Sequence, residues 1–191
     1  GFLITSEHLN AVLTERTRAI LFASPNNPNG VVLNEDSLRV LKDAALSRDL
    51  YLSADSVYDR LVYDAPAPTL VGDSSLRDRL IYVSALSKSY AMTGVRVGYA
   101  AADRRVMEQM LKAHSFLVVS VPGCIQRGCE GIFAEDISPM LSAYKRRRDD
   151  VYARLKAMGM NVKLPDGAFY IYPSVAPYGM DADTFCERLM R

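Results

Sequence analysis

Lys88 stands in surroundings that favour covalent chemistry. It follows an apolar run, lies between Ser87 and Ser89, and precedes Arg96 by eight positions. Most lysines are solvated surface charges, but burial lowers the pKa of the amine, which can then attack a carbonyl carbon near neutral pH. An arginine in that place either forms a surface ion pair or holds a phosphate through two parallel hydrogen bonds. These residue types indicate a site for a small molecule that carries a carbonyl group and a phosphate.

Two upstream segments carry polar side chains that a heteroaromatic ligand can use. Asp55 follows the apolar run Leu50–Ala54, and Tyr58 comes three residues later. As alternatives, Asp55 is a helix cap or turn former and Tyr58 an amphipathic core residue. Asn27 lies among turn-forming residues, Ser24–Gly30, which alone indicate only a turn. If these side chains share a ligand, the carboxylate can pair with a ring nitrogen and the amide can donate to a phenolate oxygen.

Strand-like and helix-like segments alternate in the first two thirds of the chain. The expected strands are Arg18–Ala23, Leu50–Ala54, Leu80–Ser84 and Val97–Ala102, and the expected helices begin at Asn34 and Asp103. This order predicts an α/β fold, with a mostly parallel sheet flanked by helices. Ligands of such sheets bind beyond the carboxyl ends of the strands, and Asn27, Asp55 and Lys88 all fall at that edge.

The last third of the chain has a different pattern. A long helix is expected from Pro139 to Met158, with Gly159 as its C-cap. A hairpin over residues 161–172 and a helix from about Asp181 follow. We expect residues 1–137 to be a partial large domain, and residues 138–191 to be an interdomain helix and a partial small α+β domain. Because the chain starts without methionine and stops inside a helical pattern, we expect an internal fragment.

Composition excludes several classes of function. The formal net charge of +1 argues against a nucleic-acid-binding surface. No apolar run approaches the roughly 18 residues that a membrane-spanning helix needs, so we expect no membrane association. The odd number of cysteines lacks CxxC spacing and the two histidines are far apart, which indicates neither a disulfide framework nor a metal site. A cytoplasmic protein with reduced thiols is the expectation.

Three segments resemble the signature segments of class I and II aminotransferases, which are fold-type I enzymes dependent on pyridoxal 5'-phosphate. They are Ser24–Gly30, Asp55–Tyr58 and Ser87–Tyr99, in the family's order and spacing. The long helix and Gly167–Tyr170 are similar to the family's entry into its small domain, so the resemblance covers essentially the whole chain. The runs Tyr90–Gly94 and Leu61–Asp64 are most similar to the prokaryotic aspartate and aromatic aminotransferases.

The resemblance implies a role for each matched residue around the cofactor ring. Lys88 forms a Schiff base with the cofactor and later moves the proton of the substrate Cα. Asp55 pairs with the ring nitrogen. Asn27 and Tyr58 hydrogen-bond the phenolic oxygen of the ring and so adjust the pKa of the imine. Lys88, Asp55 and Tyr58 are therefore the expected catalytic residues.

The resemblance also implies a phosphate site at Ser87 and Arg96. The family often has a serine three residues before the lysine as a further phosphate ligand, but this chain has Ala85 there. Either Ser84 or Ser87 must therefore serve, or that contact is lost. In the family, a glycine-rich phosphate loop and the arginine that binds the substrate carboxylate belong to parts outside these 191 residues, so we expect the chain alone to be inactive.

The function implied by the resemblance is transfer of an amino group from an L-amino acid to a 2-oxo acid, in a homodimer. Two alternatives stay open. The same motifs occur in pyridoxal-phosphate carbon–sulfur lyases and related synthases, which differ in their products. They also occur in the effector-sensing aminotransferase-like domain of some transcription regulators, which is not an enzyme. Neither the amino acid nor the 2-oxo acid can be inferred from these motifs.

Overall fold

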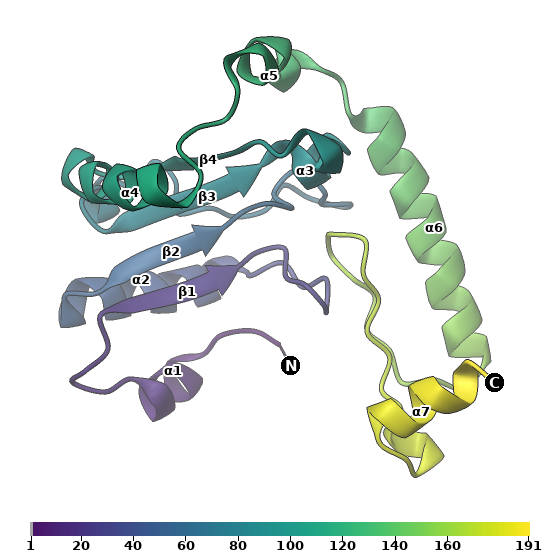
Figure 1. The fold of residues 1–191 in the computed structure, drawn as a ribbon. Coiled ribbons are helices and arrows are strands. Elements are labelled where there is room, and N and C mark those ends of the chain that lie inside the picture. The colour runs from purple at the N-terminus through teal and green to yellow at the C-terminus, as the bar shows by residue number, and fades with distance from the viewer. Residues whose placement is uncertain (1) are drawn as a thin grey trace.

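The structure is a computed structural model that describes residues 2–191, and it is organised around a four-stranded sheet (Figure 1). The strands are β1 (Ala19–Ala23), β2 (Tyr51–Asp55), β3 (Leu80–Ala85) and β4 (Gly98–Ala101). They lie in the order β1-β2-β3-β4; the first three are parallel, and β4 is antiparallel to β3. The predicted α/β class with a mostly parallel sheet is confirmed.

One face of the sheet is densely packed against α2 (Glu35–Arg48). As predicted, Asn34 caps this helix, and its side-chain oxygen accepts a hydrogen bond from the Ser37 amide at 2.9 Å. The helix presents apolar residues one turn apart, and the strands present every second side chain, to a common core. The buried members of this core are Leu9, Leu33, Leu38, Leu41, Ala45, Leu52, Leu70 and Leu76.

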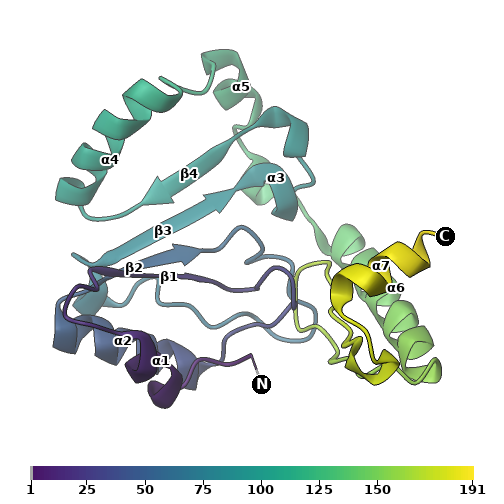
Figure 2. The same ribbon diagram turned by 60° about the horizontal axis from the view of Figure 1, so that its bottom comes forward.

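The other face carries α4 (Arg104–Leu117), which lies opposite α2 and along β3 and β4 (Figure 2). None of the residues of α4 is buried, and the side chain of Leu21, which points away from α2, is 75% exposed. Helices therefore flank both faces of the sheet, but only the α2 side has a close-packed core. Among residues 2–191, no helix is long and apolar enough to cross a membrane.

The last third of the chain leads away from the sheet along α6 (Ser138–Ala157), the longest helix (Figure 1). The remaining helices are α1 (Ser6–Val12), α3 (Leu86–Ser89), α5 (Gly123–Gly128) and α7 (Ala182–Leu189), with 3-10 turns at Ser74–Leu76, Thr93–Val95, Ile132–Ala134 and Ala176–Tyr178. Gly159 follows α6 with a φ of +78°, as a glycine C-cap requires. Asp181 caps α7, so both predicted helices are confirmed.

The predicted hairpin strand at Ala168–Tyr172 is wrong. Asn161 and Ser174 form only an isolated antiparallel bridge, and Ala168 has a φ of +56°, outside the extended region. The reason is that the backbone here bonds to the loops beyond the sheet and not to a partner strand: the Ala168 amide donates to the Leu61 carbonyl at 2.8 Å. This segment therefore joins the end of the chain to the edge of the sheet.

Candidate active site

The carboxyl ends of three parallel strands bring the predicted site residues to one edge of the sheet. β1 leads into the turn that holds Asn27, β2 ends at Asp55, and β3 leads directly into α3, which holds Lys88. The Ser24 amide donates to the Asp55 carbonyl at 3.2 Å, which keeps the Asn27 turn paired with β2. The parallel pairing of β1, β2 and β3 is thus enough to gather an amide, a carboxylate and an amine.

The hydroxyl of Tyr170 lies between Asn27 and Tyr58. The Asn27 Nδ2 donates to the Tyr170 Oη at 3.3 Å, and the two tyrosine hydroxyl oxygens are 2.5 Å apart and share a hydrogen bond. Tyr58 is only 4% exposed, and its burial, then the Tyr170 hydroxyl and the charge of Asp55, raise the pKa of its phenol. The amide and the phenol predicted to hold a phenolic oxygen therefore both hydrogen-bond one hydroxyl, on a tyrosine of the chain itself.

Phe169 connects this pair of tyrosines to Lys88. The centroid of its ring lies 5.5 Å from that of Tyr58 in an edge-to-face arrangement, and the Lys88 Nζ lies 5.7 Å from the same centroid. On α6, Tyr144 stacks on the Phe169 ring with centroids 5.6 Å apart. The amine of Lys88 and the hydroxyl of Tyr58 thus belong to one cluster with an aromatic wall.

Asp55 is half-buried beside this cluster. Its Oδ1 accepts a hydrogen bond from the Val57 amide at 3.2 Å, which fixes the carboxylate at the start of the turn to Tyr58. The carboxylate is near enough to Tyr58 for its charge to raise the phenol pKa. The structure therefore brings together the three predicted catalytic residues, Lys88, Asp55 and Tyr58, with Asn27.

The two predicted phosphate ligands follow β3. Ser87 precedes Lys88 in α3 and is half-buried, whereas Arg96 is exposed and donates from Nη1 to the Thr93 carbonyl at 2.8 Å. Ser84, the other serine considered, is 3% exposed and donates its hydroxyl to the Ser56 carbonyl at 3.2 Å. Ser87 is thus the better candidate of the two. Within residues 2–191, no hydrogen bond joins Arg96 to the other predicted site residues.

Close backbone contacts hold the segment before Phe169 against the loops of the sheet edge. The Asp166 and Gly167 amides both donate to the Gly30 carbonyl at 2.9 Å. A Cβ on Gly167 would lie 2.7 Å from the Leu61 carbonyl oxygen and 2.7 Å from Pro25 Cγ. Only glycine permits this approach, and it fixes the segment beside the Asn27 turn.

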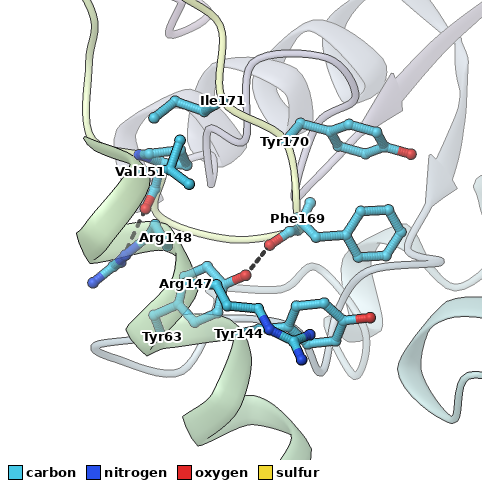
Figure 3. A pocket seen from close by; sticks show the side chains of 10 residues that line it. Tyr63, Tyr144, Arg147, Arg148, Val151, Phe169, Tyr170 and Ile171 are labelled. Carbon is cyan, nitrogen blue, oxygen red and sulfur yellow. Dashed lines mark hydrogen bonds between the residues drawn. The ribbon is translucent and has the colours of Figure 1, made fainter. Parts of the chain in front are cut away.

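Arg148, a buried side chain of α6, binds the segment before Phe169 from the side of that helix (Figure 3). Tyr63 donates its hydroxyl to the Ala168 carbonyl, and the Arg148 guanidinium carbon lies 4.6 Å from the centre of the Tyr63 ring. Arg148 also donates to the Pro165 carbonyl and to Asp64, both at 3.0 Å. Although Arg148 belongs to the basic run Lys145–Arg148, its side chain is only 6% exposed.

A cavity of about 180 Å³ lies between α6 and the Pro165–Ile171 segment (Figure 3). Tyr63, Tyr144, Val151 and Phe169 are among its lining residues. Burial, outweighing the charge of Arg148, raises the pKa of Tyr63 to about 12, so its hydroxyl keeps the proton that it donates to Ala168. The cavity backs onto the site through the Phe169 ring.

Sequence reasoning did not identify Phe169 and Tyr170 as part of the site. Tyr170 is 112 residues from Tyr58 and 143 residues from Asn27 in the sequence, so spacing carries no signal for these contacts. The sequence feature that could have indicated this contact is the pair of glycines, Gly30 and Gly167, at which the backbones of the two segments lie close together. Among residues 2–191, no group of three or more His, Cys, Asp or Glu side chains could hold a metal ion.

Comparisons with known proteins agree with this arrangement. The profile of the family described as "Aminotransferase class I and II" matches residues 1–191. An aspartate aminotransferase of Thermotoga maritima is 36% identical over 190 residues, which cover 100% of this chain and 50% of the relative. An aromatic-amino-acid aminotransferase of Thermococcus litoralis is 31% identical over 196 residues, with 100% and 50% covered.

Among solved structures, an aromatic aminotransferase from Pyrococcus horikoshii superposes with a TM-score of 0.94 at 31% identity. The superposition covers 98% of this chain and 52% of that chain. The chain thus spans about half the length of the relatives that it matches. The match along all of its residues shows that the chain belongs to the class I and II aminotransferase family, whose members depend on pyridoxal 5'-phosphate.

Proposed function

We propose that the whole protein transfers an amino group from an L-amino acid to a 2-oxo acid, and that this chain holds the reactive end of its pyridoxal phosphate. Family membership supports the type of reaction. The observation that supports the assignment of residues is that Asn27 and Tyr58 both hydrogen-bond one phenolic hydroxyl, that of Tyr170, beside Asp55 and Lys88.

The donor set fits the cofactor group by group. Pyridoxal phosphate has a phenolic oxygen, and the polar groups of Asn27 and Tyr58 lie close enough together to hydrogen-bond one phenolic hydroxyl, that of Tyr170. Its ring nitrogen suits the carboxylate of Asp55, and its aldehyde suits the amine of Lys88. In a second group of contacts, Ser87 and the free donors of Arg96 would hold the phosphate.

When bound, the cofactor supplies an aldehyde that reacts with amines and an aromatic ring that withdraws electrons from the substrate Cα. Lys88 would supply the amine that holds the aldehyde, and its Nζ, when free, would accept a proton from the substrate Cα as a general base. Asp55 would keep the ring nitrogen protonated, and Asn27 and Tyr58 would donate hydrogen bonds to the phenolic oxygen.

The test is an amino-transfer assay of the whole protein with pyridoxal phosphate and a panel of L-amino acids and 2-oxo acids. Lys88→Ala should abolish turnover, because it removes the amine that is proposed to hold the cofactor aldehyde. Lys112→Ala is the matched control, since Lys112 is exposed on α4 and hydrogen-bonds Gln109 on the same helix. Undiminished turnover in Lys88→Ala would disprove the assignment, and release of pyruvate and ammonia without an amino acceptor would indicate a lyase.

We also propose a homodimeric assembly, because the family resemblance implies that each site receives residues from a partner subunit. The cytoplasm is the proposed compartment, since Cys124, Cys129 and Cys186 are free thiols. Residues 1–137 and 138–191 are proposed to belong to the large and small domains. Light scattering of the whole protein tests the assembly directly, and a monomer that transfers amino groups would contradict it.

A further inference from the structure

Tyr170 is a polar residue in the site to which the proposed reaction assigns no task. Its hydroxyl is within hydrogen-bonding distance of both side chains that are proposed to hold the phenolic oxygen of the cofactor. We propose that Tyr170 is a positioning residue: its hydroxyl donates to the Tyr58 oxygen and thereby directs the single O–H of Tyr58 toward the cofactor. This inference rests on the proposed function and adds a residue to it.

The fold holds the Tyr170 ring where this role requires it. Ala168 precedes Tyr170 by two residues, and its amide donates to the Leu61 carbonyl at 2.8 Å. Leu61 in turn follows Tyr58 by three residues, so this hydrogen bond joins the two tyrosine-bearing segments. The carbonyl of Ala168 accepts from Tyr63, so both polar groups of this peptide are fixed. The Tyr170 ring also packs against Phe169 with centroids 4.9 Å apart, and edge-on against Tyr58 at 5.6 Å.

A count of hydrogen-bond donors gives the direction of the shared hydrogen bond. The amide of Asn27 has two N–H donors, and one of them goes to Tyr170. Each tyrosine has one O–H donor. If Tyr170 donates to Tyr58, then Asn27 keeps one N–H and Tyr58 keeps its O–H, so two donors remain for one phenolic oxygen. If Tyr58 donated to Tyr170, its only donor would be used within the chain.

The hydrogen bond from Asn27 favours the first direction, because it polarises the Tyr170 hydroxyl and makes it a better donor. Burial, then the hydrogen bond to Tyr170 and the charges of Tyr170 and Asp55, raise the pKa of Tyr58, so Tyr58 keeps its own proton at neutral pH. Asn27, Tyr170 and Tyr58 therefore form an ordered chain of donors that ends at the site.

The test measures the pH at which the absorbance of the lysine-bound cofactor changes in the whole protein. Donors to the phenolic oxygen stabilise the deprotonated state, so losing a donor raises this apparent pKa. Tyr170→Phe removes only the hydroxyl and should raise it by about 0.4–1 unit. Tyr58→Phe should raise this apparent pKa further. Tyr172 is exposed and lies two residues after Tyr170, so Tyr172→Phe should leave the apparent pKa unchanged.

The double variant Tyr58→Phe/Tyr170→Phe distinguishes positioning from direct contact. Because Tyr170 acts through Tyr58, the double variant should shift no further than Tyr58→Phe alone. An unchanged pKa in Tyr170→Phe, or additive shifts in the double variant, would overturn the inference while leaving the proposed function intact. If the parent protein shows no cofactor absorbance that Lys88→Ala removes, the proposed function itself fails.

Discussion

Replacing Gly167 with alanine tests whether the segment that carries Phe169 and Tyr170 is fixed to the edge of the sheet. The added Cβ would lie 2.7 Å from both the Leu61 carbonyl oxygen and Pro25 Cγ, whereas ordinary contact begins at 3.4 Å and Cβ atoms essentially never approach closer than 3.0 Å. The two backbones must therefore separate by roughly 0.3–0.7 Å. Neither neighbour can rotate away, because one is a backbone carbonyl and the other a proline ring.

The expected cost of Gly167→Ala is about 1–3 kcal/mol of unfolding free energy, as for other overpacked sites. At this chain size, the cost corresponds to a Tm lowered by about 2–12 °C. A shift of the same size along the hydrogen bond from Asn27 to Tyr170, now 3.3 Å, would take it beyond hydrogen-bonding distance. The variant should therefore also bind pyridoxal phosphate more weakly.

Thermal unfolding and cofactor titration measure both effects, with Gly128→Ala as the matched control. Gly128 ends α5, and a Cβ built on it meets no heavy atom within 4 Å. Alanine there should leave the Tm unchanged or raise it slightly. If Gly167→Ala melts and binds cofactor like Gly128→Ala, the close approach at the sheet edge is not real and the argument fails.

Two further predictions concern ion pairs. Arg148→Met removes the guanidinium bonded to Asp64 and to the Pro165 carbonyl, and should lower the unfolding free energy by about 1–3 kcal/mol in urea denaturation, whereas exposed Arg146→Met should not. Hydrogen bonding by Lys42, at 2.5 Å, and then by Ser75 lowers the pKa of Asp73 from 3.8 to about 2. The lowered pKa stabilises the fold above about pH 4, and the stabilisation is lost as the pH falls to about 2. In Lys42→Met, the urea midpoint of unfolding should fall less between about pH 4 and about pH 2 than it does in the parent protein. An unchanged pH dependence of the midpoint would contradict the assigned cause.

Local patterns were sufficient to predict the sheet and the residues at its edge. Each strand is a short apolar run bounded by turn residues, and the parallel order of the first three strands places Asn27, Asp55 and Lys88 at one edge. The cap at Asn34 was predictable for the same reason, because a cap is decided by residues three apart. These features depend on neighbours in the sequence.

Contacts between distant segments could not be predicted in this way. The expected strand at Ala168–Tyr172 has suitable residues, but bonds to Gly30 and Leu61 determine its conformation. Arg148 has the sequence context of a surface residue, and only the approach of Tyr63 and Asp64 buries it. The place of Tyr170 in the site follows from these tertiary contacts.

The central claim is that Lys88 is the amine that captures the cofactor. The most direct measurement is borohydride reduction of the whole protein with pyridoxal phosphate, followed by peptide mapping by mass spectrometry. Reduction makes the link between the lysine nitrogen and the cofactor carbon permanent. We predict a single modified residue, Lys88, at stoichiometric yield. Modification at Lys42, Lys112, Lys145, Lys156 or Lys163 with Lys88 unmodified, or no modification of any lysine, would contradict the account.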